Sequence, residues 1–533
     1  MSFVRIERTC GERKLATAGR GARAQRARST TGSKPPGGRS FVREAVEIDS
    51  PGSSEKIMPT QLRTLTPEPT TLSDETLRDF RAEFRGSVIG PLDSEYEQAC
   101  VVQNGAFRGR PGLVLRCHGT ADVVDAVELA RRSRLLVTVR GGGHSVAGHS
   151  SCEGGLLIDL SGMRAVTVDP QRGVVRAQGG ATWGDVDRES QLFGLAVPGG
   201  IVSTTGVGGL TLGGGIGWLH RAYGLACDNL RAVELVTADG RVVHADDEHY
   251  PELMWGLRGG GGNFGIVTAF EFDAHPLGPT VMDSTVIYDA DDAETLLRRW
   301  RDWADTVPDE VTTRALFWTM PADPTLPPEL HNRDVFILAA LYAGDVASGQ
   351  RVLEPIARFG TPVADLSAPT PYRLAQSSFD VFFPRGELLS YWKSIYLDEL
   401  TDDAVELVLR RSRQRPHPLT MVHLPLLGGA MKRVDAAATA FGDRKAGYML
   451  SVDGNWLEPS DSARVTEWVR DTVAEAATLP AAAGTYLNFS GDTEVDDAVR
   501  RAAFGTNLRR LTRLKTEYDP DNLFRSNSNI PPE

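Results

Sequence analysis

The sequence has little cysteine and no long hydrophobic run. Its 533 residues include five cysteines, which are Cys10, Cys100, Cys117, Cys152 and Cys227. Their odd number and wide spacing, without any CxxC pair, exclude a disulfide framework and a cysteine-based zinc site. No stretch reaches the roughly 18 apolar residues that a membrane-spanning helix needs. We therefore expect neither a metal site nor a membrane span.

Acidic residues outnumber basic ones outside the N-terminus. The net charge of −12 argues against nucleic-acid binding. Residues 1–57 hold 12 Lys and Arg against 6 Asp and Glu, so they carry +6 and the remainder carries −18. This Arg-, Ser- and Gly-rich segment is expected to be a disordered basic extension. It is either a targeting or interaction tail or, as we favour, an upstream extension of a domain that starts near Met58. It lacks the apolar region of a secretory signal, which favours a cytoplasmic protein.

The length of 533 residues predicts more than one domain, and the hydrophobic spacing predicts an α+β protein. In the first half, helices are expected at 120–135 and 183–194, with Thr120 and Asp122 as capping candidates. Strands or hairpins are expected at 135–141, 154–163, 164–182 and 231–247. After residue 278, amphipathic helices are expected at 292–307, 346–360, 402–415 and 462–479. Strands at 313–320, 335–344 and 418–430 lie between these helices. This pattern indicates a sheet covered by helices.

Glycine, in contrast, is abundant and clustered. Dense stretches lie at 137–150, 198–230 and 257–272. Such loops let a ligand approach the backbone and offer N–H groups to phosphates. A dinucleotide G-x-G-x-x-G motif starting at Gly206 fails because position 211 is Thr211, and no Walker loop occurs. The alternative is that these glycines simply form turns.

Several motifs occur in an order that resembles a known family. They are "VRGGGHS", "GLLIDLSGM", "GGATWGDVD", "VSTTGVGGLTLGGGIGWL", "LRGGGGNFGIVT", "YLNFSGD" and "YDPDNLFRSNSNIPP". Together they resemble the vanillyl-alcohol-oxidase-type flavoenzymes, and among these the berberine-bridge-enzyme-like branch. The resemblance implies an α+β fold with a two-lobed PCMH-type FAD-binding domain and an α+β substrate domain whose sheet is covered by helices. It places the FAD domain at 58–277 with a core of about 107–277. The substrate domain follows at 278–484, and a C-terminal segment at 485–533 returns to the FAD domain.

The resemblance also implies how FAD is held. His144 matches the histidine that links to the 8α carbon of the flavin, although a purely hydrogen-bonding His144 is the alternative. Val202 stands where many relatives have a second linking cysteine, so a single covalent link is expected. The pyrophosphate is expected at Gly141, Gly142, Gly143 and Ser145, with Arg140 nearby. The flavin is expected at Thr204, Thr205, Gly206, Gly208 and Gly209, with close approach at Gly214 and Gly215.

Further cofactor contacts are less specific. Ile266 and Val267 are expected to pair with the adenine through their backbone. Asp228 and Asn229 either contact the cofactor or cap a helix. Asn527 and Asn529 either hydrogen-bond to the flavin or end the fold.

The reaction needs a base near the flavin. In the resembled family a Tyr in a Y-x-N motif often serves, which here is Tyr486, with Asn488 expected on the same face of a strand. Tyr486 could equally only shape the pocket. His423 lies among apolar neighbours and either lines the pocket or is a core histidine; Lys393 and Tyr396 are weaker candidates.

These residues predict an FAD-linked oxidoreductase. It would take a hydride from a carbon that bears OH or NH in a small molecule, and O2 would reoxidise the flavin to give H2O2. The alternatives are a dehydrogenase with another acceptor, a flavin-binding protein without turnover, and a glycine-rich carbohydrate-binding protein without flavin.

Overall fold

The computed structural model describes residues 61–322, 326–491 and 496–533. These residues belong to one unit, Ile57–Glu533. The expectations for residues 1–57 lie outside the described residues. No helix in the described ranges is long and apolar enough to cross a membrane.

The first lobe is a small sheet with parallel strands. Strand order is β3-β4-β6-β5, and only β3 runs antiparallel to its neighbour. Helix α3 crosses from β4 to β5 and buries Val123, Ala126, Val127 and Ala130, one apolar stripe at helical spacing. The elements are α1 (Asp74–Glu83), β3 (Ser87–Ile89), α2 (Tyr96–Cys100), β4 (Leu113–Arg116), α3 (Thr120–Arg132), β5 (Val137–Arg140) and β6 (Leu156–Asp159).

The second lobe is an antiparallel sheet of order β11-β10-β12-β8-β7. Both predicted hairpins are confirmed, and Asp239-Gly240 turns β10 into β11, with Gly240 at φ 85°. The predicted helix α4 ends in a 3₁₀ turn closed by left-handed Gly194. The strands and helices are β7 (Val166–Asp169), β8 (Val174–Gln178), α4 (Trp183–Ser190), α5 (Val207–Leu212), α6 (His220–Tyr223), β10 (Leu230–Val236), β11 (Val242–Asp246), α7 (Pro251–Leu257) and β12 (Ile266–Asp273).

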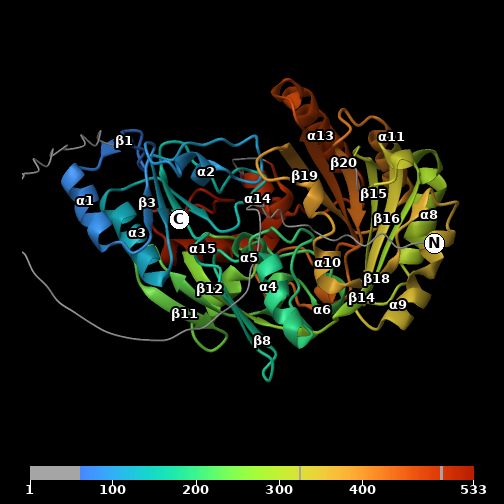
Figure 1. Ribbon diagram of the computed structural model, residues 1–533, viewed down its shortest axis with the longest axis horizontal. Coiled ribbons are helices and arrows are strands. Elements are labelled where there is room, and N and C mark those ends of the chain that lie inside the picture. The colour runs from blue at the N-terminus through green and yellow to red at the C-terminus, as the bar shows by residue number, and fades with distance from the viewer. Residues whose placement is uncertain (1–60, 323–325, 492–495) are drawn as a thin grey trace, which may run out of the picture. The chain divides into compact units, whose positions relative to one another are not determined.

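The second half forms one large antiparallel sheet. Seven of its strands follow the order β17-β14-β16-β15-β20-β21-β19, and β18 pairs with β14. Four helices lie outside this sheet (Figure 1); they are α8 (Ala293–Ala304), α9 (Val346–Leu353), α11 (Asp402–Arg413) and α13 (Ser462–Ala476). The strands are β14 (Thr280–Asp289), β15 (Val311–Thr319), β16 (Asp334–Tyr342), β17 (Ala364–Asp365), β18 (Ala368–Pro371), β19 (Leu389–Leu397), β20 (Met421–Pro425) and β21 (Tyr448–Trp456). The helix-covered sheet confirms the predicted α+β class.

Alternation along the strands separates the two faces of this large sheet. Ala315, Phe317, Val422, Leu424 and Val452 pack into the core beneath the helices. Because successive side chains point to opposite faces, their neighbours along the chain must face the other way, toward the glycine-rich lobes.

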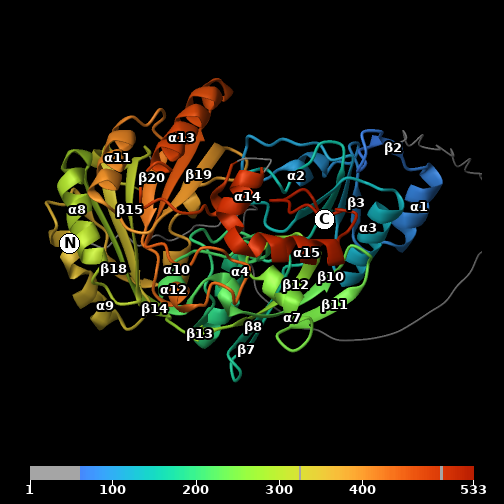
Figure 2. The ribbon, with the colours of Figure 1, turned by 180° about the vertical axis from the view of Figure 1, so that it is seen from behind.

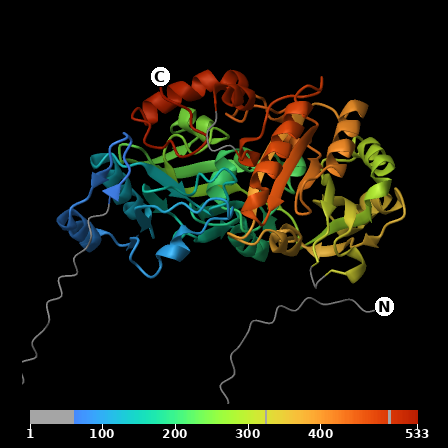
Figure 3. The same cartoon turned by 90° about the horizontal axis from the view of Figure 1, so that it is seen from above.

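The C-terminal segment returns to the second lobe. Helices α14 (Asp497–Phe504) and α15 (Leu508–Tyr518) follow the large sheet in the chain. Helix α15 contacts α7, and the red C-terminal helices lie over the green second lobe (Figures 2 and 3). The buried Lys515 Nζ donates to Asn263 O at 2.9 Å and to Phe524 O at 3.0 Å, and pairs with Asp519 at 2.6 Å. These contacts fix the chain end against the third glycine stretch.

Some local predictions were wrong. Thr120 does not cap α3: Gly119 holds that position, and Asp122 instead accepts from the His118 N–H at 2.7 Å. Tyr486 and Asn488 do not lie on a strand. They lie at a 3₁₀ turn, Leu487–Phe489, so their proximity comes from the turn rather than from alternation.

Candidate active site

A cavity of about 350 Å³ lies where the three glycine stretches meet the inner face of the large sheet and the C-terminal segment. Most of the predicted site residues line it. They are Gly141, Gly142, Gly143, His144, Ser145, Val202, Thr205, Gly206, Gly208, Gly209, Ile266, Val267, His423, Asn488 and Asn527. Among the described residues, the predicted ones that do not line it are Arg140, Thr204, Gly214, Gly215, Asp228, Asn229, Tyr486 and Asn529.

Arg140 directly precedes the first glycine loop and is held by a buried ion pair. Its guanidinium donates to both Asp159 oxygens, at 2.9 and 3.2 Å, and to Ala99 O at 2.6 Å. Burial acts to raise the pKa of Asp159, but the bonds from Arg140 hold it below its usual value. Arg140 is therefore committed to this ion pair at the end of β5, and it does not line the cavity.

The loop after Arg140 has the features of a phosphate cradle. In the described parts of the chain, the amide N–H groups of Gly142 to Ser145 form no hydrogen bond. A Cβ on Gly142 would lie 2.4 Å from Gly206 N, so only glycine permits this approach of the two loops. Consecutive free N–H groups bind anions, and the site therefore fits the pyrophosphate of FAD.

His144 projects from this loop and is held by the second one. Its Nε2 lies 2.9 Å from Thr204 Oγ1, and its Nδ1 lies 3.4 Å from Thr205 Oγ1. Its pKa is lowered to about 3, mainly by burial and to a smaller extent by the nearby positive charge of Arg385. The imidazole is therefore neutral at physiological pH, and a neutral ring nitrogen is the nucleophilic form.

Gly214 and Gly215, later in the second loop, do not line the cavity but pack closely against neighbouring residues. Gly214 and Gly215 have φ of 116° and 93°, which side chains rarely adopt. A Cβ on Gly214 would clash with Phe441, and one on Gly215 with Ala226. These two glycines let the loop turn next to Phe441 and Ala226.

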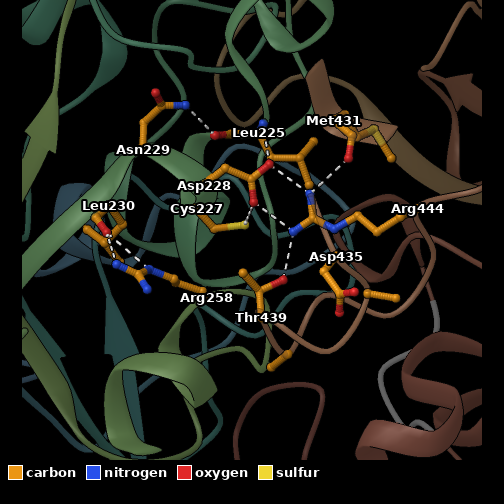
Figure 4. A network of polar contacts seen from close by, with 12 residues as sticks. Leu225, Cys227, Asp228, Asn229, Leu230, Arg258, Met431, Asp435, Thr439 and Arg444 are labelled. Atoms are coloured by element: carbon orange, nitrogen blue, oxygen red, sulfur yellow. Dashed lines mark hydrogen bonds and ion pairs between the residues drawn. The ribbon is translucent and has the colours of Figure 1, made fainter. Parts of the chain in front are cut away.

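Asp228 and Asn229 do not line the cavity; they take part in the network of polar contacts shown in Figure 4. Asp228 accepts from the Leu225 N–H at 2.9 Å and from Arg444 at 2.7 and 2.6 Å. Asn229 donates to the carbonyl oxygens of Tyr223 and Leu225. Of the two roles left open by the sequence, this geometry matches capping.

The C-terminal asparagines differ in position. Asn527 lines the cavity and donates to Gly262 O at 3.0 Å and to Phe524 O at 3.1 Å. Its Oδ1 is buried without a partner among the described residues, so it can accept a hydrogen bond from a cofactor. Asn529 instead accepts from Arg500 through its carbonyl oxygen.

Tyr486 is buried behind the cavity wall. Its Oη accepts from the N–H groups of Gly215 and Ile216, each at 3.1 Å, and from Asn488 Nδ2 at 3.0 Å. Burial raises the pKa of this phenol despite these donors. The hydroxyl thus holds the glycine loop and Asn488 in place, and a role of Tyr486 as the base stays a prediction.

The inner face of the large sheet supplies the other wall. Leu316 is directly opposite His423, and Met421 is opposite Asp453, so all four side chains share one face, and all four line the cavity. Arg314, two residues before Leu316, lies on the same face and also lines it.

His423 and Asp453 form a buried pair on this face. His423 Nε2 lies 3.1 Å from Asp453 Oδ2, and Ser451 Oγ donates to Asp453 Oδ1 at 2.5 Å. A carboxylate only accepts, so Nε2 carries a hydrogen, and in the neutral form of the ring the lone pair is on Nδ1. That Nδ1 is buried and has no partner among the described residues. His423 can therefore accept a proton from a ligand in the cavity.

The sequence interpretation missed Asp453, Arg314 and Trp392, which all line the cavity. Strands β19 and β21 were not predicted, so Trp392 and Asp453 had no assigned face. Arg314 lies in a predicted strand, "TRALFWTM", where one charge among apolar residues was a usable signal.

Comparison with known proteins gives the family. Residues 111–246 match the family model described as FAD binding domain, and residues 485–531 match berberine and berberine like. The FAD-linked oxidoreductase YgaK of Bacillus subtilis is 31% identical over 462 residues, covering 85% of this chain and 98% of that protein. (R)-6-hydroxynicotine oxidase of Paenarthrobacter nicotinovorans is 28% identical over 472 residues, covering 84% and 97%.

Solved structures show the same fold. The crystal structure of 6-hydroxy-D-nicotine oxidase from Arthrobacter nicotinovorans matches with a TM-score of 0.75 at 26% identity, over 85% of this chain and 99% of that one. BBE-like 1 of Physcomitrella patens matches with a TM-score of 0.76 at 23% identity, over 86% and 99%. Family models, relatives and fold agree with the resemblance read from the glycine motifs. The chain is an FAD-linked oxidoreductase and belongs to the berberine-bridge-enzyme-like family.

Proposed function

We propose that this enzyme oxidises a small molecule at a carbon that bears a hydroxyl or amine, and that it passes the electrons to O2 to give H2O2. The observation that carries the proposal is the convergence on one cavity of free loop N–H groups, His144 and the His423–Asp453 pair. Bound FAD would supply the chemistry of hydride acceptance and of reoxidation by oxygen.

The protein's own part is to bind the substrate and take its proton. The Nδ1 lone pair of His423 accepts the O–H or N–H proton as the carbon loses its hydride, and the product is a carbonyl or an imine. Asp453 orients the ring through Nε2 and stabilises the positive charge that the ring gains. The apolar wall excludes water from the reacting carbon.

We also propose that FAD is held by a single covalent bond to His144. The neutral imidazole lines the cavity and is oriented by Thr204 and Thr205. Val202 lines the same cavity and has no atom that can form a thioether, so it cannot supply a second link.

The test is a panel of secondary and benzylic alcohols and the matching amines, with O2 consumption and H2O2 measured together. An oxidase consumes O2 and forms H2O2 in equal amounts. It needs a dye as electron acceptor only when O2 is absent. Substrate oxidation that needs the dye even in air would identify a dehydrogenase instead. Failure of every alcohol and amine to reduce the flavin would contradict the proposed reaction.

A further inference from the structure

One cation in the cavity is left without a partner. Arg314 is 2% exposed and lines the cavity from strand β15. Within the described chain its guanidinium forms no ion pair and no hydrogen bond, and its Nε is buried without an acceptor. Burying a charge without hydrogen bonds is costly, so such a group is retained where a ligand completes it.

The surroundings stabilise the charge and leave its donors free. The Trp218 ring lies 4.6 Å from the guanidinium carbon. Stacking uses the face of the guanidinium, whereas its N–H groups point outward in its plane. Burial lowers the pKa of Arg314 to about 10, although the negative charge of Asp453 acts to raise it. The group therefore stays charged at neutral pH, with a fork of donors that suits a carboxylate.

Arg314 is also placed correctly relative to the proton acceptor. Leu316 is opposite His423, so Arg314 and His423 are diagonal neighbours on one face, about 7–8 Å apart at the backbone. Among the described residues that line the cavity, Arg314 is the only Lys or Arg, and Asp453, already bound by His423 and Ser451, is the only carboxylate.

Aromatic rings fill the space around these two groups. Trp392 and Phe489 line the cavity with their centroids 5.5 Å apart, and Phe489 lies 6.3 Å from His423. Phe379 also lines the cavity and stacks on Trp218 beside Arg314. This wall suits a flat apolar body rather than a polyhydroxylated one.

We propose that Arg314 binds a carboxylate of the substrate, so that the enzyme acts on small aromatic acids that carry an oxidisable alcohol or amine. This substrate class rests on the proposed function, because it is Arg314 and His423 together that fix which carbon reacts. The carboxylate is held by the guanidinium fork, and the ring lies against the aromatic wall.

The binding test compares benzoate with benzamide, which has the same shape and no charge, by calorimetry on the flavin-loaded enzyme. Benzoate should bind about 10- to 100-fold more tightly, as expected for hydrogen bonds to a charged group. Arg314→Met should abolish this preference, and Arg314→Lys should retain part of it. Arg358→Met, at an exposed arginine (72%) outside the cavity, is the matched control. Equal affinities in the unmodified enzyme, or a preference that survives Arg314→Met, would overturn the proposal.

A turnover test separates this proposal from the proposed function. We expect 4-(hydroxymethyl)benzoate to be oxidised with a higher kcat/KM than 4-(hydroxymethyl)benzamide, and the difference to disappear in Arg314→Met. Oxidation of both at equal kcat/KM would overturn the carboxylate site and leave the oxidase intact. Tight benzoate binding without oxidation of any alcohol or amine would support the site and contradict the reaction. The comparison of the two ligands in the unmodified enzyme holds even if Arg314→Met fails to fold.

Discussion

At the scale of single residues, the state of His144 decides whether it can bond to the flavin. Its pKa of about 3 lies below the ordinary histidine value of about 6.5. A lowered pKa means that the neutral form persists as the pH falls, down to about 3. We therefore predict that flavin-free protein incubated with FAD forms the covalent bond to the same extent at about pH 5.5 and pH 7.5. Flavin fluorescence of the denatured protein measures it. A loss of attachment with a midpoint near 6.5 would contradict a buried, neutral His144.

The proton acceptor is the second residue-scale question. His423→Asn removes the free Nδ1, and we predict that flavin reduction by substrate slows by about 10²- to 10⁴-fold in stopped-flow measurements. Asp453→Asn should slow it as well, and the two effects should not add, because both residues act through one ring.

Tyr486→Phe is the informative comparison for that experiment. It removes an oxygen that accepts from two backbone N–H groups, so we predict a loss of about 1–3 kcal/mol in the free energy of unfolding. Because Tyr486 does not line the cavity, the rate of flavin reduction should fall less than that of His423→Asn. A larger rate effect in Tyr486→Phe than in His423→Asn would make the tyrosine the base.

At the scale of elements, the Lys515–Asp519 pair connects α15 to the glycine loop and the chain end. Both side chains are 0% exposed, so Lys515→Met leaves a buried carboxylate uncompensated. We predict a loss of about 3–5 kcal/mol in the free energy of unfolding, measured in urea. Arg358→Met breaks an exposed pair with Glu354 and should cost less than about 1 kcal/mol. Equal losses in the two variants would show that the buried pair does not hold the segment.

Local elements were predictable, whereas contacts between distant strands were not. Helix α3 and the β10–β11 hairpin follow from apolar spacing and an Asp-Gly turn, which act within a few residues. Likewise, the glycine loops and His144 are adjacent in sequence, so the cofactor side could be predicted. The substrate side depends on the register of β15, β20 and β21. Only that register reveals that Arg314, His423 and Asp453 share a face.

The same limit applies to the side-chain contacts of Arg140 and Tyr486. Sequence places Arg140 directly before the phosphate-binding loop, but its side chain turns to Asp159 on the neighbouring strand. Tyr486 was expected to alternate with its neighbours along a strand, whereas a 3₁₀ turn directs its hydroxyl to the loop at Gly215. Both outcomes are set by tertiary partners that no local pattern specifies.

At the scale of the whole molecule, the cavity is shared. Both small sheets, the large sheet and the C-terminal segment contribute to its wall. A ligand that binds only the folded state stabilises every part that it touches. We predict that flavin-free protein melts roughly 2–5 °C below the flavin-loaded protein, with the whole transition shifted in calorimetry. A shift confined to one of two separate transitions would mean that the cofactor contacts only one part.

We expect FAD to occupy this cavity and to be bonded through His144 alone. The most direct measurement is flavin fluorescence in a denaturing gel of acid-precipitated protein, with His144→Ala beside the unmodified chain. We predict one fluorescent band for the unmodified chain and none for His144→Ala. A yellow protein whose flavin is released on denaturation, or a band that persists in His144→Ala, would contradict it.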